Sequence, residues 1–347
     1  MNSIKLKIPF FNRRSFETKE AVKVHRLVKE VRLKGGKRLR ILDEVSFKVP
    51  VGSKVAIIGP SGCGKTALLK VISTIYIPDY GEVKVFDLDI VKDAGKIRRK
   101  ISFVSPSLDF HKKLTLDETL KFFAKVQGSD TEPAYSFLEF IKMNGLRERP
   151  LEGFSEGQKA AVRLAIGLMK RPKLLLLDEP TANLDVARKE MVIEYLQRKV
   201  EGATIMMVDH DPKVVSRLCD QVILMKAGGK VIRSCEAKSL LKGFPFKYQF
   251  NIKVYSKAQF SRESLEKLGY PFQLAGNVVR FLLSSKEEVK DLTEKLMGKR
   301  GLLSFEVSYV NMEDVYYWIN QQLEEGVGAE AVANVGIVQT ARRGGKA

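Results

Sequence analysis

Short apolar runs recur along the first part of the chain and alternate with longer amphipathic stretches. Three of these runs are Lys54–Ile58, Leu174–Leu177 and Thr204–Val208. A continuous apolar run of this length is typical of a strand buried on both faces, and helices separate such strands in parallel sheets. The pattern therefore predicts an α/β core with a parallel sheet covered by helices.

Two further patterns flank and interrupt this core. Residues 22–33 alternate apolar and polar side chains up to a turn signal, and residues 45–49 form a second β-like run. These runs predict a small antiparallel sheet at the edge of the parallel one. The apolar spacing then becomes helical, which predicts a helical insertion at about 105–170, with helices at 116–125, 132–143 and 157–169.

The pattern changes again after Phe244. It predicts strand 246–255, helix 262–268, strands 272–275 and 278–283, a helix opened by the capping box Ser285/Glu288, strand 302–310 and a last helix from Asn311. The order βαββαβ with a final helix is typical of a ferredoxin-like α+β domain. We therefore expect a basic lead-in (1–21), an α/β domain (22–243), an accessory α+β domain (244–326) and a flexible tail (327–347).

Length and composition fit this division. The chain has 347 residues, 44% of them hydrophobic, which suits two domains with ordinary cores. Its apolar runs are far shorter than the about 18 residues of a membrane span, and the first residues lack the apolar stretch of a signal peptide. The three cysteines, Cys63, Cys219 and Cys235, show no pairing or metal-ligand spacing. We expect a cytoplasmic protein with free thiols.

Positive charge is the unusual feature of the composition. Lys and Arg outnumber Asp and Glu by 60 to 41, a net charge of +19, and the first 50 residues carry 14 basic and 5 acidic side chains. Such a surface suits anionic lipid or nucleic acid. A solvated basic face explains the same charge, so charge alone does not identify a partner.

The strand at 54–58 leads directly into a phosphate-binding motif, G-x-x-x-x-G-K-[ST], which lies between a strand and a helix as the motif requires. Its glycines let backbone N–H groups curl around phosphate oxygens at the positive end of the helix. The lysine can reach the β- and γ-phosphates of ATP, and the threonine hydroxyl can bind Mg²⁺. The motif consists of Gly59, Pro60, Ser61, Gly62, Cys63, Gly64, Lys65 and Thr66.

A second strand supplies the partner of this motif. The run Leu174–Leu177 ends in Asp178, which places a carboxylate beside the Mg²⁺ in the role of a Walker-B aspartate. Glu179 follows, where it can polarise the attacking water. Alone, the pattern also fits a capped strand end. Together with the phosphate loop it predicts hydrolysis of a nucleoside triphosphate.

Three further segments make a family resemblance specific. Phe154–Gln158 opens a helix upstream of Asp178 and resembles the L-S-G-G-Q signature of ABC ATPases. Thr181–Asp185 resembles their D-loop, and Val208–Asp211 resembles the segment that carries their switch histidine. The motifs occur in family order over residues 22–240, so the chain is similar to the ABC transporter ATPases. The expected fold is a P-loop NTPase (RecA-like) core with an edge antiparallel sheet and a helical insertion.

The resemblance implies a composite site. In this family two ATPase subunits pair head to tail, so the ATP held by one phosphate loop faces the signature of the other subunit. Ser155, Gly157 and Gln158 would contact that ATP across the dimer, and the D-loop residue Asp185 would also lie at it. His210 would sense the γ-phosphate from the same side as the phosphate-loop lysine.

Three positions depart from the family pattern. Val31 occupies the place of the aromatic residue that stacks on adenine, and Pro106 that of the Q-loop glutamine. Proline has no side-chain donor or acceptor, so it can neither bind Mg²⁺ nor orient water. Glu156 replaces a signature glycine and adds a charge near the phosphate. Slow hydrolysis is still expected, because the catalytic residues are present.

The C-terminal segment narrows the function. Residues 308–316 resemble the ending of ABC-2-type export ATPases, although the same apolar residues also fit the core face of an ordinary helix. The leading hypothesis is an ATPase subunit at the cytoplasmic face of the membrane. It would pair with a second ATPase subunit, drive a separate multi-span permease docked through the helical insertion, and contact anionic lipid through its basic surface.

Two alternatives stay open. A soluble ABC ATPase that acts on nucleic acid or the ribosome fits the +19 charge, but the chain has one motor and no long coiled-coil arm. A regulatory, weakly catalytic half of an ABC heterodimer fits the proline at position 106.

Overall fold

The computed structural model describes residues 19–33, 36–200, 202–255, 260–297 and 301–325. They form two compact units: unit 1 contains residues 19–237 and unit 2 residues 238–319, with residues 320–325 grouped with unit 1. The break lies at the start of α8 (Ala237–Lys242), a few residues before the expected boundary at 243/244. Most of the expected lead-in and the whole tail lie outside the described residues.

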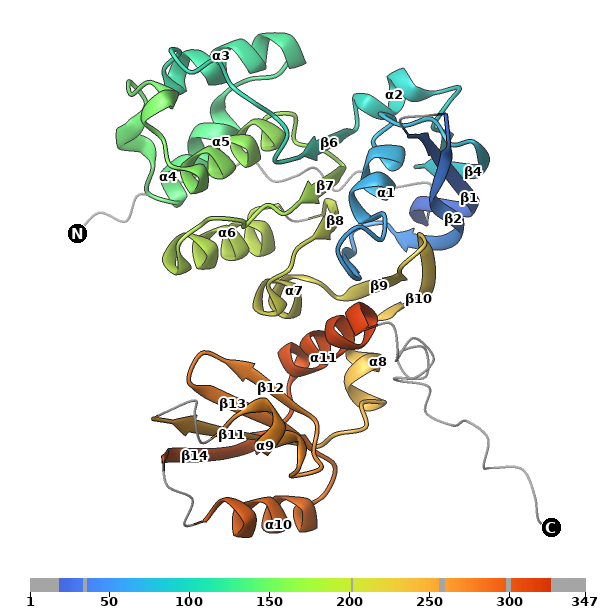
Figure 1. The fold of residues 1–347 in the computed structure, drawn as a ribbon. Helices are drawn as coiled ribbons and strands as arrows, with labels where there is room; N and C mark the ends of the chain where they lie inside the picture. The colour runs from blue at the N-terminus through green and yellow to red at the C-terminus, as the bar shows by residue number, and fades with distance from the viewer. Residues whose placement is uncertain (1–18, 34–35, 201, 256–259, 298–300, 326–347) are drawn as a thin grey trace, which may run out of the picture. The chain divides into compact units, whose positions relative to one another are not determined.

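Unit 1 is built on a six-stranded sheet of order β10-β9-β3-β8-β7-β6 (Figure 1). Five strands run parallel, and β10 is antiparallel to β9. Every residue of β7 and β8 is buried, as continuous apolar runs require. The predicted α/β core is therefore confirmed. The strands are β3 (Lys54–Ile58), β6 (Ile101–Val104), β7 (Leu174–Asp178), β8 (Thr204–Val208), β9 (Gln221–Lys226) and β10 (Lys230–Glu236).

A second, antiparallel sheet of unit 1 has the order β2-β1-β4-β5, as expected for the edge sheet. Its strand β2 begins seven residues earlier than the apolar run at 45–49, because pairing with β1 extends the ladder over polar residues: Glu30 lies opposite Arg40, and Arg32 opposite Arg38. The strands are β1 (Glu20–Arg32), β2 (Arg38–Pro50), β4 (Tyr80–Val85) and β5 (Leu88–Asp89), and α2 (Ala94–Arg98) follows.

The helical insertion lies between β6 and β7, as predicted. Its helices α3 (Leu116–Gln127), α4 (Glu132–Phe140) and α5 (Glu156–Leu168) gather on the side of unit 1 away from β1, β2 and β4 (Figure 1). Thr115 starts α3 with a capping box: its amide donates to the Glu118 carboxylate at 2.9 Å, and the Glu118 amide donates to the Thr115 hydroxyl at 3.2 Å. Short 3₁₀ turns at Asn144–Leu146 and Leu151–Gly153 connect α4 to α5.

Unit 2 is a four-stranded antiparallel sheet of order β12-β13-β11-β14, the order expected of a ferredoxin-like split βαβ unit. Leucines of α9 and α10 pack on one face of it, against the core side chains of β11 and β13. The elements are β11 (Tyr248–Val254), α9 (Arg262–Glu266), β12 (Phe272–Ala275), β13 (Val278–Leu283), α10 (Lys286–Leu296), β14 (Leu302–Tyr309) and α11 (Met312–Glu325).

The predicted capping box of α10 is only half formed. The Ser285 hydroxyl accepts from the Glu288 amide at 3.3 Å, but the Glu288 carboxylate accepts from the amide of Ser284 at 2.6 Å and not from that of Ser285. The returning bond is therefore displaced by one residue, which still satisfies an amide at the helix start.

A buried ion pair ties the start of α11 to the sheet of unit 2. Arg280 on β13 donates to Asp314 Oδ1 at 2.7 Å, and the carboxylate also accepts from the Asn311 amide at 2.8 Å. Asp314 is fully buried. Burial raises its pKa, while the bond from the Asn311 amide and the charge of Arg280 lower it. The guanidinium of Arg280 thus balances the charge of this buried carboxylate.

Two further expectations concern the whole described chain. Within the described ranges, none of the helices is long and apolar enough to span a bilayer. Cys63, Cys219 and Cys235 are all unpaired, as expected of free thiols.

Candidate functional site

The phosphate loop connects β3 to α1 (Lys65–Ile72), the strand–loop–helix order that the motif requires. Gly64 caps the helix with φ of +101°, and a Cβ there would lie 2.5 Å from the carbonyl oxygen of Ile41, so only glycine fits. The Lys65 ammonium donates to the carbonyl oxygens of Gly59 (2.7 Å) and Pro60 (2.9 Å). The loop therefore holds a cation at the positive end of a helix, an arrangement that suits phosphate.

Thr66 and Asp178 meet at the floor of this loop. The Thr66 hydroxyl, in the first turn of α1, donates to Asp178 Oδ1 at 3.1 Å. Asp178 ends β7 and is only 6% exposed. Burial raises its pKa, the bond from Thr66 lowers it, and the charge of Glu179 raises it. None of the ion pairs among the described residues includes Asp178, so no cationic side chain pairs with this buried carboxylate.

The donor set of Thr66 and Asp178 fits Mg²⁺, which prefers hard oxygen ligands. In the described part of the chain, no group of three or more His, Cys, Asp or Glu side chains could hold a metal ion by itself. Mg²⁺ usually takes one or two protein ligands together with substrate phosphates. The pair is therefore suited to a metal that arrives with a nucleotide.

Glu179 and His210 come together at the ends of neighbouring strands. Because β7 and β8 are parallel and Asp178 lies opposite Val208, the residues that follow both strands meet at one edge of the sheet. His210 Nε2 lies 3.1 Å from Glu179 Oε1, and the two side chains are 52% and 42% exposed. Glu179 has φ of +50°, a strained conformation of the kind that clusters at functional sites.

The sequence analysis missed a buried contact behind His210. The hydroxyl of Thr181 donates to Asp209 Oδ2 at 2.7 Å, and the amide of Asp211 donates to Asp209 Oδ1 at 2.9 Å. Burial raises the pKa of Asp209, and these two hydrogen bonds lower it. The contact holds the residues on both sides of His210 against the D-loop. The adjacent motifs Thr181–Asp185 and Val208–Asp211 were the only signal of it in the sequence.

The signature segment forms the start of α5. Ser155 is its N-cap: the Ser155 amide donates to Gln158 Oε1 at 3.0 Å, and the Gln158 amide donates to Ser155 Oγ at 3.2 Å. A Cβ on Gly157 would lie 2.3 Å from the carbonyl oxygen of Asn183, so this glycine lets α5 pack against the D-loop. Lys159 pairs with Glu156 at 2.8 Å, and its hydrogen bond lowers the pKa of Glu156. The extra charge in the signature is therefore balanced locally.

Asp185 caps α6 (Val186–Arg198) within its own chain. Its carboxylate accepts from the amide of Arg188 at 2.9 Å and from the guanidinium of Arg188 at 2.6 Å. The bond from the Arg188 amide is the largest cause of the lowered pKa of Asp185. Asp185 is therefore ionised and held at the N-terminus of α6, at the end of the D-loop.

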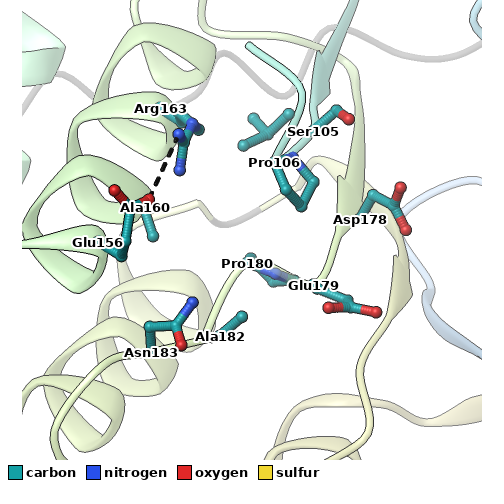
Figure 2. Close-up of a pocket in the computed structure, with 11 residues that line it drawn as sticks. Ser105, Pro106, Glu156, Ala160, Arg163, Asp178, Glu179, Pro180, Ala182 and Asn183 are labelled. Atoms are coloured by element: carbon teal, nitrogen blue, oxygen red, sulfur yellow. Dashed lines mark ion pairs between the residues drawn. The ribbon is translucent and has the colours of Figure 1, made fainter. Parts of the chain in front are cut away.

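A hollow of about 90 Å³ lies between the carboxylates of Asp178 and Glu179 and α5. Asp178 and Glu179 lie on one side of it, and Glu156 and Arg163 of α5 on the other (Figure 2). Pro106 lines the hollow just after β6. The predicted Q-loop position thus lies beside these two carboxylates, and its side chain offers them no polar atom.

Arg163 is a further residue of this hollow that the sequence did not single out. It reaches from α5 to the segment after β6, where its Nε donates to the carbonyl oxygen of Leu108 at 2.8 Å. Its guanidinium also lies 5.5 Å from the ring centroid of Phe110. Arg163 therefore fixes the segment that carries the Q-loop position to the helical insertion.

Val31 lies on β1 and lines a separate polar hollow of about 260 Å³. The other side chains around that hollow are charged: Lys29, Glu30, Arg32, Arg38 and Asp79. Because none of these lining residues is aromatic, this surface has no ring to stack on a base.

Cys63 in the phosphate loop is buried, which raises the pKa of its thiol, as suits a space-filling residue.

The chain is similar in sequence to proteins of a known family. The family model described as ABC transporter matches residues 42–182. The ABC transporter ATP-binding protein NatA of Bacillus subtilis (strain 168) is 30% identical over 203 residues, which cover 57% of this chain and 82% of NatA. The linearmycin resistance ATP-binding protein LnrL of the same strain is 28% identical over 193 residues, 54% of this chain and 62% of LnrL.

Another relative is named for import. The Fe(3+) ions import ATP-binding protein FbpC of Pasteurella multocida (strain Pm70) is 30% identical over 208 residues, and the match covers 58% of each chain. The match to LnrL and FbpC thus spans less than two thirds of either relative.

Among solved structures, the dimeric post-hydrolysis state of the ATP-binding cassette MJ0796, bound to ADP and Pi, is similar with a TM-score of 0.57 and 26% identity. The match covers 62% of this chain and 98% of that one. A bacterial Atm1-family ABC exporter with ATP bound shares the fold at 20% identity, with a TM-score of 0.57. The P-loop NTPase fold expected from the sequence is therefore confirmed.

Proposed function

Since the chain belongs to the ABC transporter ATP-binding proteins, we propose that it is the motor of an ABC-2-type exporter and drives a separate membrane permease. Its activity as an ATP-binding, ATP-hydrolysing cassette follows from the family. The exporter type, the permease and the roles of individual residues are our proposal. They are supported below by the geometry of the site and by the exposed surfaces.

The contacts Thr66–Asp178 and Glu179–His210 carry the assignment of the site. Lys65 binds the β- and γ-phosphates, with Gly59, Pro60, Ser61, Gly62, Cys63 and Gly64 wrapping their backbone around them. Thr66 and Asp178 hold the Mg²⁺, which when bound draws charge from the phosphate oxygens. Glu179 polarises the attacking water, and His210 orients Glu179 and contacts the γ-phosphate.

A second ATPase subunit completes the site in this proposal, as the dimeric MJ0796 cassette suggests. Ser155 and Gly157 offer the N-terminus of α5 to the nucleotide of the partner subunit. The side chains of Gln158 and Asp185 already cap helices in their own chain. Their contribution to nucleotide binding is therefore to fix the two helix starts that face the partner.

An exposed apolar stripe on α3 supports docking of a permease. Phe122 and Val126 are four residues apart, on the same face of the helix, and are 55% and 66% exposed. Of the other aromatic residues in this region, Phe110 is buried and packs edge-on against Phe123, and Phe103 packs against the core. We therefore assign Phe122 and Val126 to the permease contact, which places the chain at the cytoplasmic face of the membrane.

Export is supported by two features. Residues 308–316 resemble the ending of ABC-2-type export ATPases, and in the structure they belong to a small α+β unit. One relative, LnrL, is named for resistance, whereas FbpC is named for iron import. The direction we propose therefore rests on the C-terminal unit and not on the relatives.

The net charge of +19 supports a second candidate, a soluble ABC ATPase that binds nucleic acid. Binding of RNA or DNA that weakens steeply with salt, in the absence of any membrane protein, would favour it. Co-purification with a multi-span membrane protein would favour the exporter. The third reading, a weakly catalytic half of a heterodimer, is supported by Pro106 beside the catalytic carboxylates.

Replacing Glu179 by Gln tests the site. We expect ATP turnover to fall by about 10²–10⁴-fold, the usual contribution of a general base, with ATP affinity unchanged because Lys65 and Thr66 stay in place. Glu148→Gln, which removes one exposed carboxylate outside the site, is the matched control and should leave turnover unchanged. Equal turnover in both variants would remove Glu179 from its assigned role.

A further inference from the structure

A second cavity of unit 1, of about 590 Å³, shares no lining residue with the phosphate loop or with the hollow beside it. Three segments build it: Arg98 and Arg99 at the end of α2, residues 127–130 at the end of α3, and residues 169–171 after α5. Its volume lies in the range of about 300–1,000 Å³ that small-molecule sites occupy.

The lining of this cavity is strongly cationic. Arg98, Arg99, Lys170 and Arg171 face one carboxylate, Asp130, which leaves a net charge of +3. Arg171 is matched by acidic groups, since it pairs with Asp130 at 3.0 Å and with Glu132 at 3.1 Å. The ion pairs of the described residues include neither Arg98 nor Arg99. Two guanidinium groups therefore lie at the cavity without a counter-charge.

Lys170 adds a third cation without an acidic partner in the described chain. Its ammonium donates to the carbonyl oxygen of Arg98 at 3.3 Å, and it is partly buried. Burial lowers its pKa, because no carboxylate is close enough to offset the loss of water. A cation in such a place gains from an anionic ligand.

Two neutral polar atoms at the cavity also lack partners. Gln127 Oε1 and Ser129 Oγ are shielded from water and have no hydrogen-bond partner. They flank Gly128, whose φ of +61° ends α3. An unsatisfied buried polar atom costs about 1–3 kcal/mol. Both residues line the cavity, so rotation of either side chain would bring its polar atom to a ligand that also carries hydroxyl or amino groups.

We propose that this cavity is a second phosphate site of the chain, which binds a nucleotide-like phosphorylated small molecule. Arg98 and Arg99 take its phosphates, because the guanidinium fork binds phosphate oxygens in pairs, and Lys170 adds charge beneath them. Gln127 and Ser129 meet the hydroxyl or amino groups of the ligand. The site is independent of the ATP that is hydrolysed.

The position of the cavity indicates what its ligand would do. Arg98 ends α2, three residues before β6 of the core sheet begins at Ile101, whereas Gln127 and Ser129 belong to the helical insertion. A ligand that contacts both would restrain the insertion relative to the sheet. Since the proposed permease contact lies on α3, occupation of this cavity would regulate the coupling of ATP hydrolysis to transport.

Counting bound nucleotide tests this site on the full chain. ADP labelled with a methylanthraniloyl group is the probe, and we expect two molecules per wild-type chain. Arg98→Ala/Arg99→Ala should bind one, with affinity at the lost site reduced about tenfold to hundredfold, the worth of charge-assisted hydrogen bonds. Lys112→Ala/Lys113→Ala removes two exposed cations elsewhere on the insertion and should still bind two.

Lys65→Ala separates the two sites. It should bind one molecule of probe, inorganic pyrophosphate should displace that molecule, and adding Arg98→Ala/Arg99→Ala should abolish binding. The proposal is overturned if Lys65→Ala binds no probe, if pyrophosphate fails to displace it, or if the arginine changes leave its affinity intact. Should Lys65→Ala not fold, one molecule per wild-type chain overturns it equally. Loss of the phosphate-loop molecule would instead count against the proposed function.

Discussion

Asp178 in unit 1 and Asp314 in unit 2 are both buried carboxylates whose pKa burial raises. Asp314 is met by the guanidinium of Arg280 at 2.7 Å, and it closes the start of a helix. Among the described residues, Asp178 is met only by the hydroxyl of Thr66, at 3.1 Å, and it lies beneath a glycine-rich loop. The same residue type is therefore structural in one unit and suited to a metal in the other.

Asp209 is intermediate between the two. It is held by the hydroxyl of Thr181 and the amide of Asp211, and no ion pair of the described residues includes it. The comparison teaches that burial alone does not mark a site. A buried carboxylate is suited to an external cation where its own chain leaves it without one and it also lies beneath a phosphate-binding loop, as Asp178 does and Asp209 does not.

The largest effect is expected where a cation is removed from a buried pair. Arg280→Met leaves Asp314 buried with one amide donor, and breaking such a pair typically lowers the free energy of unfolding by about 3–5 kcal/mol. Since Arg280 is itself about one third exposed, we expect the lower end of that range. Denaturant unfolding at neutral pH measures it. The double variant Arg280→Met/Asp314→Asn should recover most of the loss, and failure to recover would show that the pair is not the cause.

A smaller effect is expected behind His210. Thr181→Val keeps the shape of the side chain but removes the donor to Asp209, which should lower the free energy of unfolding by about 1–3 kcal/mol. ATP turnover should fall as well, because the residues around His210 lose a contact. Thr181→Ser retains the hydroxyl and is the matched control. Identical stability of the two variants would mean that the bond contributes nothing.

The smallest effect, and the one of opposite sign, is expected at Asp178. Because its pKa is raised, the folded chain binds the proton of Asp178 more tightly than the unfolded chain does. The protonated carboxyl group therefore stabilises the fold below the usual carboxyl pKa, and this stabilisation is lost as pH rises through the folded pKa. Asp178→Asn should therefore raise the melting temperature at pH 7, by roughly 2–4 °C for each 1 kcal/mol gained in the free energy of unfolding. The gain should vanish below about pH 4.

Asp314→Asn is the control for this change. The pKa of Asp314 is raised as well, so its replacement also removes the cost of ionising a buried carboxyl group. It takes the carboxylate away from Arg280, however, which retains its bond to Asn251 Oδ1, so the gain in melting temperature at pH 7 should be smaller than that of Asp178→Asn. An equal or larger gain in Asp314→Asn would show that the two carboxylates do not differ in the way their contacts indicate.

Strands that are buried on both faces were predictable to the residue. Lys54–Ile58 and Thr204–Val208 coincide with β3 and β8, because a continuous apolar run has no other place in an α/β core. The strands β4 and β5 and the hairpin of β9 and β10 were not predicted individually. Their formation depends on neighbours that lie far along the chain, such as the pairing of Val22 with Val85, and periodicity does not carry that information.

The same limit applies to the candidate sites. The phosphate loop was readable because backbone chemistry requires its glycines at fixed spacing, and Asp178 and Glu179 follow an apolar strand. The contact of Thr181 with Asp209 could not be predicted from the sequence, and neither could the cationic cavity lined by Arg98, Arg99 and Lys170. They are assembled by side chains from segments that meet only in the folded chain, and each of those residues alone resembles an ordinary polar position.

The reciprocal cap at the start of α5 has one consequence for assembly. The Ser155 oxygen accepts from the Gln158 amide, so the torsion of this side chain is settled while its own proton is still available to donate. Immobilising a rotamer-rich side chain on association usually costs about 0.5–1.5 kcal/mol. Here the ordering has taken place during folding, so two subunits that close on a nucleotide would meet with this serine already aimed.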